Sequence, residues 1–106
     1  MRRAWFYILL SLASRERYGA EIQEDVRALS DGEVRLWPAT LYGSLEELVD
    51  DGWIEELAPG EEPADAGGRS RWYRITAEGR AALVEQVERA ETVAGIARRR
   101  LGREGT

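Results

Sequence analysis

The last quarter of the chain carries an apolar stripe that is too long for the rest of a 106-residue chain to cover. From residue 83 to residue 101, apolar side chains recur at alternating spacings of four and three, which predicts a helix of about five turns. A chain of this length makes one small domain, with no second long helix to pack on the stripe. We therefore expect another copy of the chain to cover it. The stripe, and the predicted dimer interface, comprises Leu83, Val87, Ala90, Ala94, Ala97 and Leu101.

Three shorter helices are predicted upstream. Residues 2–14 are apolar on nearly every side, so this first helix should be enclosed by the rest of the fold. Residues 18–29 have the period of an amphipathic helix, and a third helix begins at Pro38 and ends before Gly52. The side chains expected on the inner faces are Ile22, Val26 and Leu29 in the second helix and Leu41, Leu45 and Leu48 in the third.

Two short strands, residues 53–57 and 71–75, flank a polar loop that is rich in proline and glycine. They predict one β-hairpin. After the hairpin, the Thr76 hydroxyl can cap the last helix, and the basic tail from Arg98 to Arg103 is expected to fray. We expect the tryptophans near the hairpin and the third helix to serve packing rather than ligand stacking; these are Trp37, Trp53 and Trp72.

The composition removes most catalytic chemistry. The chain has no cysteine and no histidine, and all 15 of its basic residues are arginine. Disulfides, Cys/His zinc sites, cysteine nucleophiles, Ser-His-Asp triads and Schiff-base lysines are therefore excluded. We expect no enzyme, no metal and no cofactor.

The N-terminus combines Arg2 and Arg3 with a ten-residue apolar run, a pattern also found in signal peptides. The run is shorter than the roughly 18 residues that a membrane-spanning helix needs, and no small-residue cleavage pattern follows it cleanly. We interpret the segment as a buried helix of a cytoplasmic protein that does not contact a membrane.

The order helix, helix, turn, helix, hairpin is that of a winged helix-turn-helix. The predicted fold class is therefore mainly α with a small β-hairpin. Residues 1–76 form the winged helix-turn-helix, and residues 77–106 form a long C-terminal dimerisation helix with its frayed tail.

Three motifs strengthen this interpretation. The segments are PATLYGSL at residues 38–45, YGAEI at residues 18–22 and GRSRWYRITAEG at residues 68–79. In residue type and order they resemble the core of the PadR-like transcriptional regulators, and the single last helix resembles that of the smaller subfamily, in which it builds the dimer. The resemblance implies a dimeric repressor that binds double-stranded DNA at a palindromic operator and is released by a small hydrophobic or phenolic effector.

The candidate site residues follow from the third helix and the hairpin. With the leucines turned inward, Ala39, Thr40 and Gly43 face outward, and Tyr42 and Ser44 flank them as polar contacts. Positive charge near the hairpin tip suits contact with phosphates. We expect it to come from Arg69, Arg71 and Arg74. Trp5, on the first helix, is assigned to the dimer interface, with the core and an effector pocket as alternatives.

The net charge of −5 leaves a competing function open. The second half of the third helix carries four acids, which repel phosphates and instead suit a winged-helix protein-interaction module with a basic partner. The same view makes the hairpin arginines a solvated face that balances the acids of residues 55–65. An acid/base enzyme built on the paired carboxylates ranks third. The four acids are Glu46, Glu47, Asp50 and Asp51.

Overall fold

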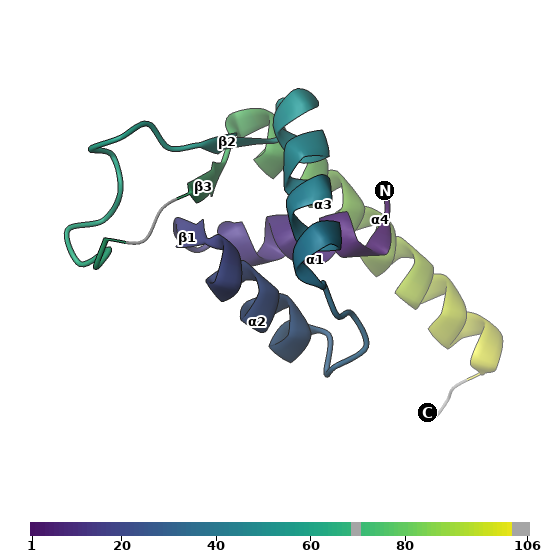
Figure 1. Cartoon of the computed structure of the whole chain (residues 1–106). Helices are drawn as coiled ribbons and strands as arrows, with labels where there is room; N and C mark the ends of the chain where they lie inside the picture. Colours follow the sequence, from purple (N-terminus) through teal and green to yellow (C-terminus); the bar gives the residue numbers. More distant parts are fainter. Residues whose placement is uncertain (69–70, 103–106) are drawn as a thin grey trace.

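The computed structural model describes residues 1–68 and 71–102 (Figure 1). The predicted fold class is confirmed: a mainly helical chain with a small sheet in winged-helix order. The helices are α1 (Arg3–Leu12), α2 (Gly19–Leu29), α3 (Pro38–Asp50) and α4 (Ala77–Leu101), and the strands are β1 (Arg17–Tyr18), β2 (Ile54–Glu56) and β3 (Trp72–Ile75).

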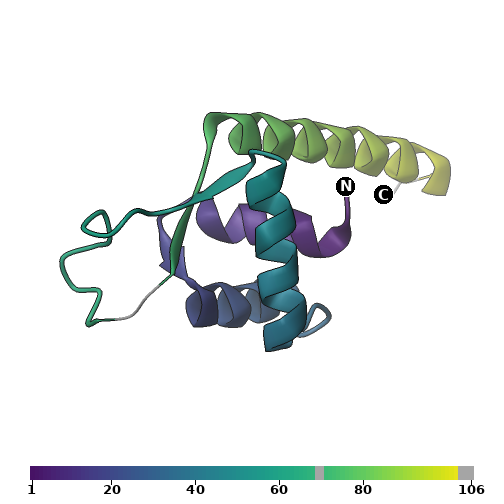
Figure 2. The same cartoon turned by 45° about the horizontal axis from the view of Figure 1, so that its top comes forward.

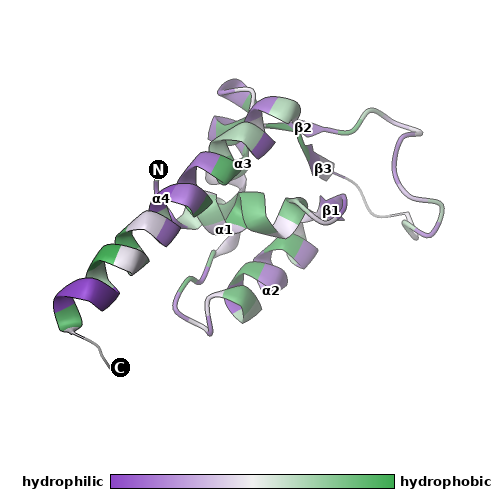
Figure 3. Ribbon diagram, turned by 180° about the vertical axis from the view of Figure 1, so that it is seen from behind, coloured by the Kyte–Doolittle hydropathy of each residue, from purple (hydrophilic) through white to green (hydrophobic). Residues whose placement is uncertain are grey.

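Helix α1 is the centre of the core. It lies between α2 and α4, and α3 crosses it (Figure 2). Its apolar character on several sides follows from this position, which Figure 3 shows by colour. The inner faces of α2 and α3 pack on it as predicted, except that Leu29, in the last turn of α2, extends past the core and is exposed. The fully buried side chains include Ile8, Leu9, Leu12, Ile22, Val26, Leu41, Leu45 and Leu48.

The sheet has three strands rather than the two of the predicted hairpin. Residues Arg17 and Tyr18 form β1, which pairs antiparallel with β3, so that β3 is the central strand in the order β1-β3-β2. A two-residue strand has no alternation of polar and apolar side chains for sequence analysis to detect. Through β1, the hairpin is joined to the segment that leads into α2.

The start of α4 is fixed to the sheet. The Thr76 hydroxyl accepts a hydrogen bond from the Gly79 N–H at 3.0 Å, the predicted cap, and donates one to the Gly52 carbonyl at 2.6 Å. A Cβ atom at Gly79 would overlap the backbone carbonyl of Trp53, so only glycine lets the helix approach this closely. Leu83, one turn further, is 8% exposed and lies in the core.

Beyond Leu83, α4 extends away from the rest of the fold (Figures 1 and 2). It remains helical through Arg98 and Arg100, where we expected fraying, and ends at Gly102 in the left-handed conformation. Arg103 lies outside the described residues. In the described part of the chain, no helix combines the length and apolarity needed to cross a membrane. Large apolar side chains are exposed along this part of α4, namely Val84, Val87, Val93, Ile96 and Leu101.

Candidate nucleic-acid interface

The N-terminal half of α3 presents a small, uncharged surface. Ala39, Thr40 and Gly43 are exposed, as the helical period predicts, and the first turn carries no acidic residue. Leu41 and Leu45 hold this half of the helix on the core from the opposite side. Small side chains allow another backbone or a base edge to come close to the helix.

Ser44 does not belong to this surface. It is only 9% exposed, so the prediction that it flanks the outer face is wrong. The physical reason is its spacing: Ser44 lies three residues after Leu41 and four before Leu48, which places it on the inner side of the helix with both leucines.

Tyr42 joins α3 to two neighbouring elements. Its side chain is half-buried, and its hydroxyl lies against Gly19 at the start of α2. The guanidinium of Arg71 lies 5.1 Å from the ring centre, within cation–π range. Tyr42 thus links the N-terminal half of α3 to α2 and to the hairpin.

The hairpin arginines are paired with acids of the same hairpin. Arg74 Nε lies 2.5 Å from Glu55 Oε2, its cross-strand neighbour, and Arg74 Nη2 lies 3.5 Å from Glu61 Oε2. Arg71 Nε lies 3.4 Å from Glu56 Oε2. These carboxylates raise the pKa of both guanidinium groups, chiefly because Arg74 donates a hydrogen bond to Glu55 and Arg71 donates one to Glu56. In the unbound protein their positive charge is therefore compensated locally.

The third hairpin arginine of the sequence-based site, Arg69, lies outside the described residues. Arg71 itself stands just before β3 with φ of 63°, in the left-handed region that side chains other than glycine rarely adopt. This backbone conformation directs the chain from the loop into the strand. The arrangement agrees with the view that Arg71 and Arg74 balance the acids of residues 55–65. Phosphates can contact these two arginines only by replacing the carboxylates.

The acids of α3 have distinct surroundings. Glu47 accepts a hydrogen bond from Arg2 Nη1 at 2.8 Å, which ties the N-terminus of the chain to α3. Glu46 and Asp50 line an open cleft of about 360 Å³ between α3 and the hairpin, together with Glu56 and Arg71. Acidic charge therefore concentrates on the side of α3 that faces the hairpin.

The floor of this cleft includes Tyr73. Its hydroxyl is buried and has no hydrogen-bond partner in residues 1–68 and 71–102. Burial raises the pKa of Tyr73 to about 12; the carboxylates of Glu56 and Glu46 act in the same direction, and the positive charge of Arg71 opposes them. The hydroxyl therefore stays neutral at any physiological pH.

Sequence analysis missed one exposed pair, Arg35 and Trp37. Trp37 is 65% exposed, so the prediction that it packs in the core or the hairpin is wrong. The indication lies in the alternation of the segment before α3: apolar Val34 and Leu36 are buried, whereas Arg35 and Trp37 are exposed. In an extended segment this alternation turns every second side chain outward.

The predicted dimer stripe is exposed along most of α4. Val87, Ala90, Ala97 and Leu101 are exposed and Ala94 is half-buried. Leu83 is the exception, because it packs in the core of its own chain and is not available to a partner.

Trp5 is half-buried and packs against the core. Its ring meets that of Trp53 edge-on, with the centroids 5.7 Å apart, and the Arg2 guanidinium lies 4.8 Å from its centre. The indole N–H is buried and has no hydrogen-bond partner among the described residues.

Comparison with known proteins decides the family. Residues 8–85 match the model of the transcriptional regulator PadR-like family. The chain belongs to this family. PadR-like proteins are transcriptional regulators and not enzymes, so the motif resemblance in the sequence and the expectation of a DNA-binding regulator are confirmed at this level.

One curated protein and several solved structures are similar to this chain in sequence or in fold. An uncharacterised protein of Lysinibacillus sphaericus is 33% identical over 81 residues, covering 76% of this chain and 72% of that protein. A transcriptional regulator from Clostridium thermocellum has a TM-score of 0.70 and 26% identity, covering 91% of this chain and 87% of that one. A PadR family regulator from Clostridium difficile, 23% identical, shares the fold with a TM-score of 0.76 over 95% of this chain and 100% of that one.

Proposed function

We propose that this PadR-like regulator is a homodimeric repressor that binds a palindromic operator in cytoplasmic DNA. In this proposal α3 enters the major groove, with Ala39, Thr40, Tyr42 and Gly43 toward the bases. The observation that carries it is the exposed, uncharged and small-residue surface on the N-terminal half of α3. Helix-turn-helix proteins read bases chiefly with that half of the helix, so the acids further along α3 need not approach the duplex.

The wing completes the proposed interface. Arg71 and Arg74, together with Arg69, approach the phosphate backbone beside the groove. Because Glu55 and Glu56 hold the two described arginines in the unbound protein, phosphates replace these carboxylates on binding.

The exposed stripe of α4 supports the dimer. Two copies of a stripe rich in alanine can approach closely, and the long axis of α4 extends clear of the winged-helix part (Figures 1 and 3). Two winged-helix parts related by a two-fold axis match the two halves of a palindromic site.

Release by a small hydrophobic or phenolic effector completes the proposal. Its support is the indole N–H of Trp5, a buried donor that has no hydrogen-bond partner among the described residues and lies on the helix that packs beside α4. A hydroxyl or carbonyl oxygen of an effector can accept this hydrogen bond when the dimer encloses the site.

In vitro selection from a random-oligonucleotide library tests the proposal. The protein should enrich a palindromic site and prefer it over a scrambled sequence. Thr40→Ala and Tyr42→Phe should each lower that preference by about 1–3 kcal/mol per lost contact, with little change in thermal stability. Equal affinity for selected and scrambled DNA would favour instead the interaction module with a basic protein partner.

A further inference from the structure

The segment between α2 and α3 displays two side chains on one side. Val34 and Leu36 are 9% and 3% exposed and belong to the core, whereas Arg35 and Trp37 point outward. The extended backbone enforces this, because successive side chains of an extended chain point to opposite sides. Trp37 precedes Pro38, which restricts it to that conformation, with φ of −72° and ψ of 155°.

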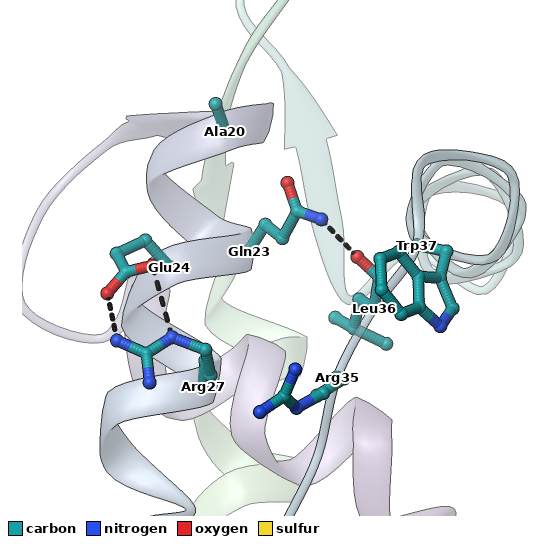
Figure 4. A pocket seen from close by; sticks show the side chains of 7 residues that line it. All are labelled: Ala20, Gln23, Glu24, Arg27, Arg35, Leu36 and Trp37. Carbon is teal, nitrogen blue, oxygen red and sulfur yellow. Dashed lines mark hydrogen bonds and ion pairs between the residues drawn. The ribbon is translucent and has the colours of Figure 1, made fainter. Parts of the chain in front are cut away.

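Hydrogen bonds hold this segment in place from both ends. The Val34 N–H donates to the buried hydroxyl of Ser30 at 2.9 Å. The side-chain amide of Gln23 in α2 donates to the Leu36 carbonyl at 2.5 Å (Figure 4). Arg35 and Trp37 are therefore presented by a fixed backbone, which reduces the ordering cost of binding through them.

Arg35 differs from the other arginines of the winged-helix part. Among the arginines that the structure describes in residues 1–76, it is the one without a carboxylate partner. Arg27, which lines the same cleft of about 170 Å³, pairs with Glu24 at 2.5 Å, and nearby Glu33 is engaged by Arg3. Arg35 thus leaves this cleft with one uncompensated positive charge beside an exposed indole (Figure 4).

We propose that Arg35 and Trp37 form a binding site for the phosphodiester backbone of DNA at the edge of the groove that α3 enters. This inference rests on the proposed function. The segment leads directly into the N-terminal end of α3, and in helix-turn-helix complexes the chain next to that end lies where the phosphate backbone passes. The Arg35 guanidinium neutralises a phosphate, while the indole of Trp37 packs on a sugar and its N–H donates to a phosphate oxygen.

This site differs from the wing in what binding requires. Arg71 and Arg74 must leave carboxylates before they contact DNA, whereas Arg35 has no carboxylate partner among the residues that the structure describes. Arg35 should therefore contribute the full release of one condensed counterion, which changes the log-affinity versus log-salt slope by about 0.9.

The test measures affinity for the selected operator and for scrambled DNA at several salt concentrations. Arg35→Ala should weaken binding to both by about tenfold and reduce the magnitude of the salt slope by about 0.9. The matched control is Arg27→Ala, which removes an equal charge from the α2 side of the cleft, where Glu24 already compensates it, and should leave the slope unchanged. Thermal melting of both variants verifies that the fold is intact.

Tryptophan emission supplies the second measurement. Trp37 is the exposed member of the four tryptophans, so DNA should alter its emission strongly, and Trp37→Phe should abolish most of that change. Trp37→Ala should also lower affinity for both DNAs. An unchanged slope in Arg35→Ala, an equal slope change in Arg27→Ala, or a full emission change in Trp37→Phe would each overturn the site while the proposed function stands. Failure of the unmodified protein to bind any DNA would overturn both.

Discussion

The hydroxyl of Tyr42 lies against the backbone of Gly19, so closely that a Cβ atom at residue 19 would overlap it. This contact sets how near α3 lies to the start of α2, the two helices of the helix-turn-helix. The Arg71 guanidinium lies 5.1 Å from the centre of the same ring, so the position of the tyrosine also affects the wing.

We predict that Gly19→Ala destabilises the protein by about 1–3 kcal/mol, because the added methyl group forces the Tyr42 side chain outward. Equilibrium unfolding in denaturant measures the loss. Gly43→Ala is the matched control: its added Cβ meets open space in the middle of α3, so it should raise stability by about 0.5–1 kcal/mol. A neutral Gly19→Ala would show that the contact does not constrain α2 and α3.

The wing carries a second prediction. Glu55→Gln should strengthen binding to any DNA several-fold, since it frees Arg74 from its closest carboxylate and removes a charge that repels phosphate. Fluorescence anisotropy with scrambled DNA measures the gain. Glu85→Gln changes the same charge on the exposed side of α4, away from the proposed interface, and should have a smaller effect. If both substitutions strengthened binding equally, the change in net charge alone would explain the gain, and the pairing of Glu55 with Arg74 would play no part.

The buried Tyr73 hydroxyl gives a prediction in alkali. Its pKa is raised from 10.0 to about 12, so the unfolded chain loses this proton first, and stability falls as pH rises from about 10 through 12. Tyr73→Phe should remove up to about 2–3 kcal/mol of that loss. At pH 7 the substitution should be neutral or stabilising by about 1 kcal/mol, because it removes a buried hydroxyl that has no partner in the described part of the chain. A marked loss at pH 7 would mean that the hydroxyl has a partner.

The proposed dimer is tested on α4. Ala94→Glu places a charge in the middle of the stripe, where a partner would bury it, and should yield monomers in analytical ultracentrifugation. Thr92→Glu adds the same charge on the opposite side of the helix and should leave the dimer intact. If Ala94→Glu still sedimented as a dimer, another surface would hold the two copies together.

Periodicity predicted the elements whose side chains follow a regular pattern. The leucines of α3 are buried as expected, and Thr76 caps α4 by the predicted hydrogen bond. Both results depend on local geometry, in which spacing along the chain fixes which side a residue faces.

Sequence analysis failed where contacts between distant segments determine the pairing of a strand or the partners of a side chain. The pairing of Arg17 and Tyr18 with β3 depends on the whole fold, and two residues are too few to form a sequence pattern that predicts a strand. Trp37 was assigned to packing by its residue type, whereas its neighbours Val34 and Leu36 take the inner positions. The carboxylates on Arg71 and Arg74 come from the opposite strand and the loop, so sequence alone left their partners open.

The close contact of Gly79 with the Trp53 carbonyl affects how far the end of α4 can move. From Gly79 to Leu101, α4 is one continuous helix, and these 23 residues span about 33 Å at a rise of 1.5 Å per residue. A tilt of α4 by about 10° at Gly79 would displace its C-terminal end by about 6 Å, given that length. A small adjustment at one glycine is thus amplified into a large change in the distance between the ends of the molecule.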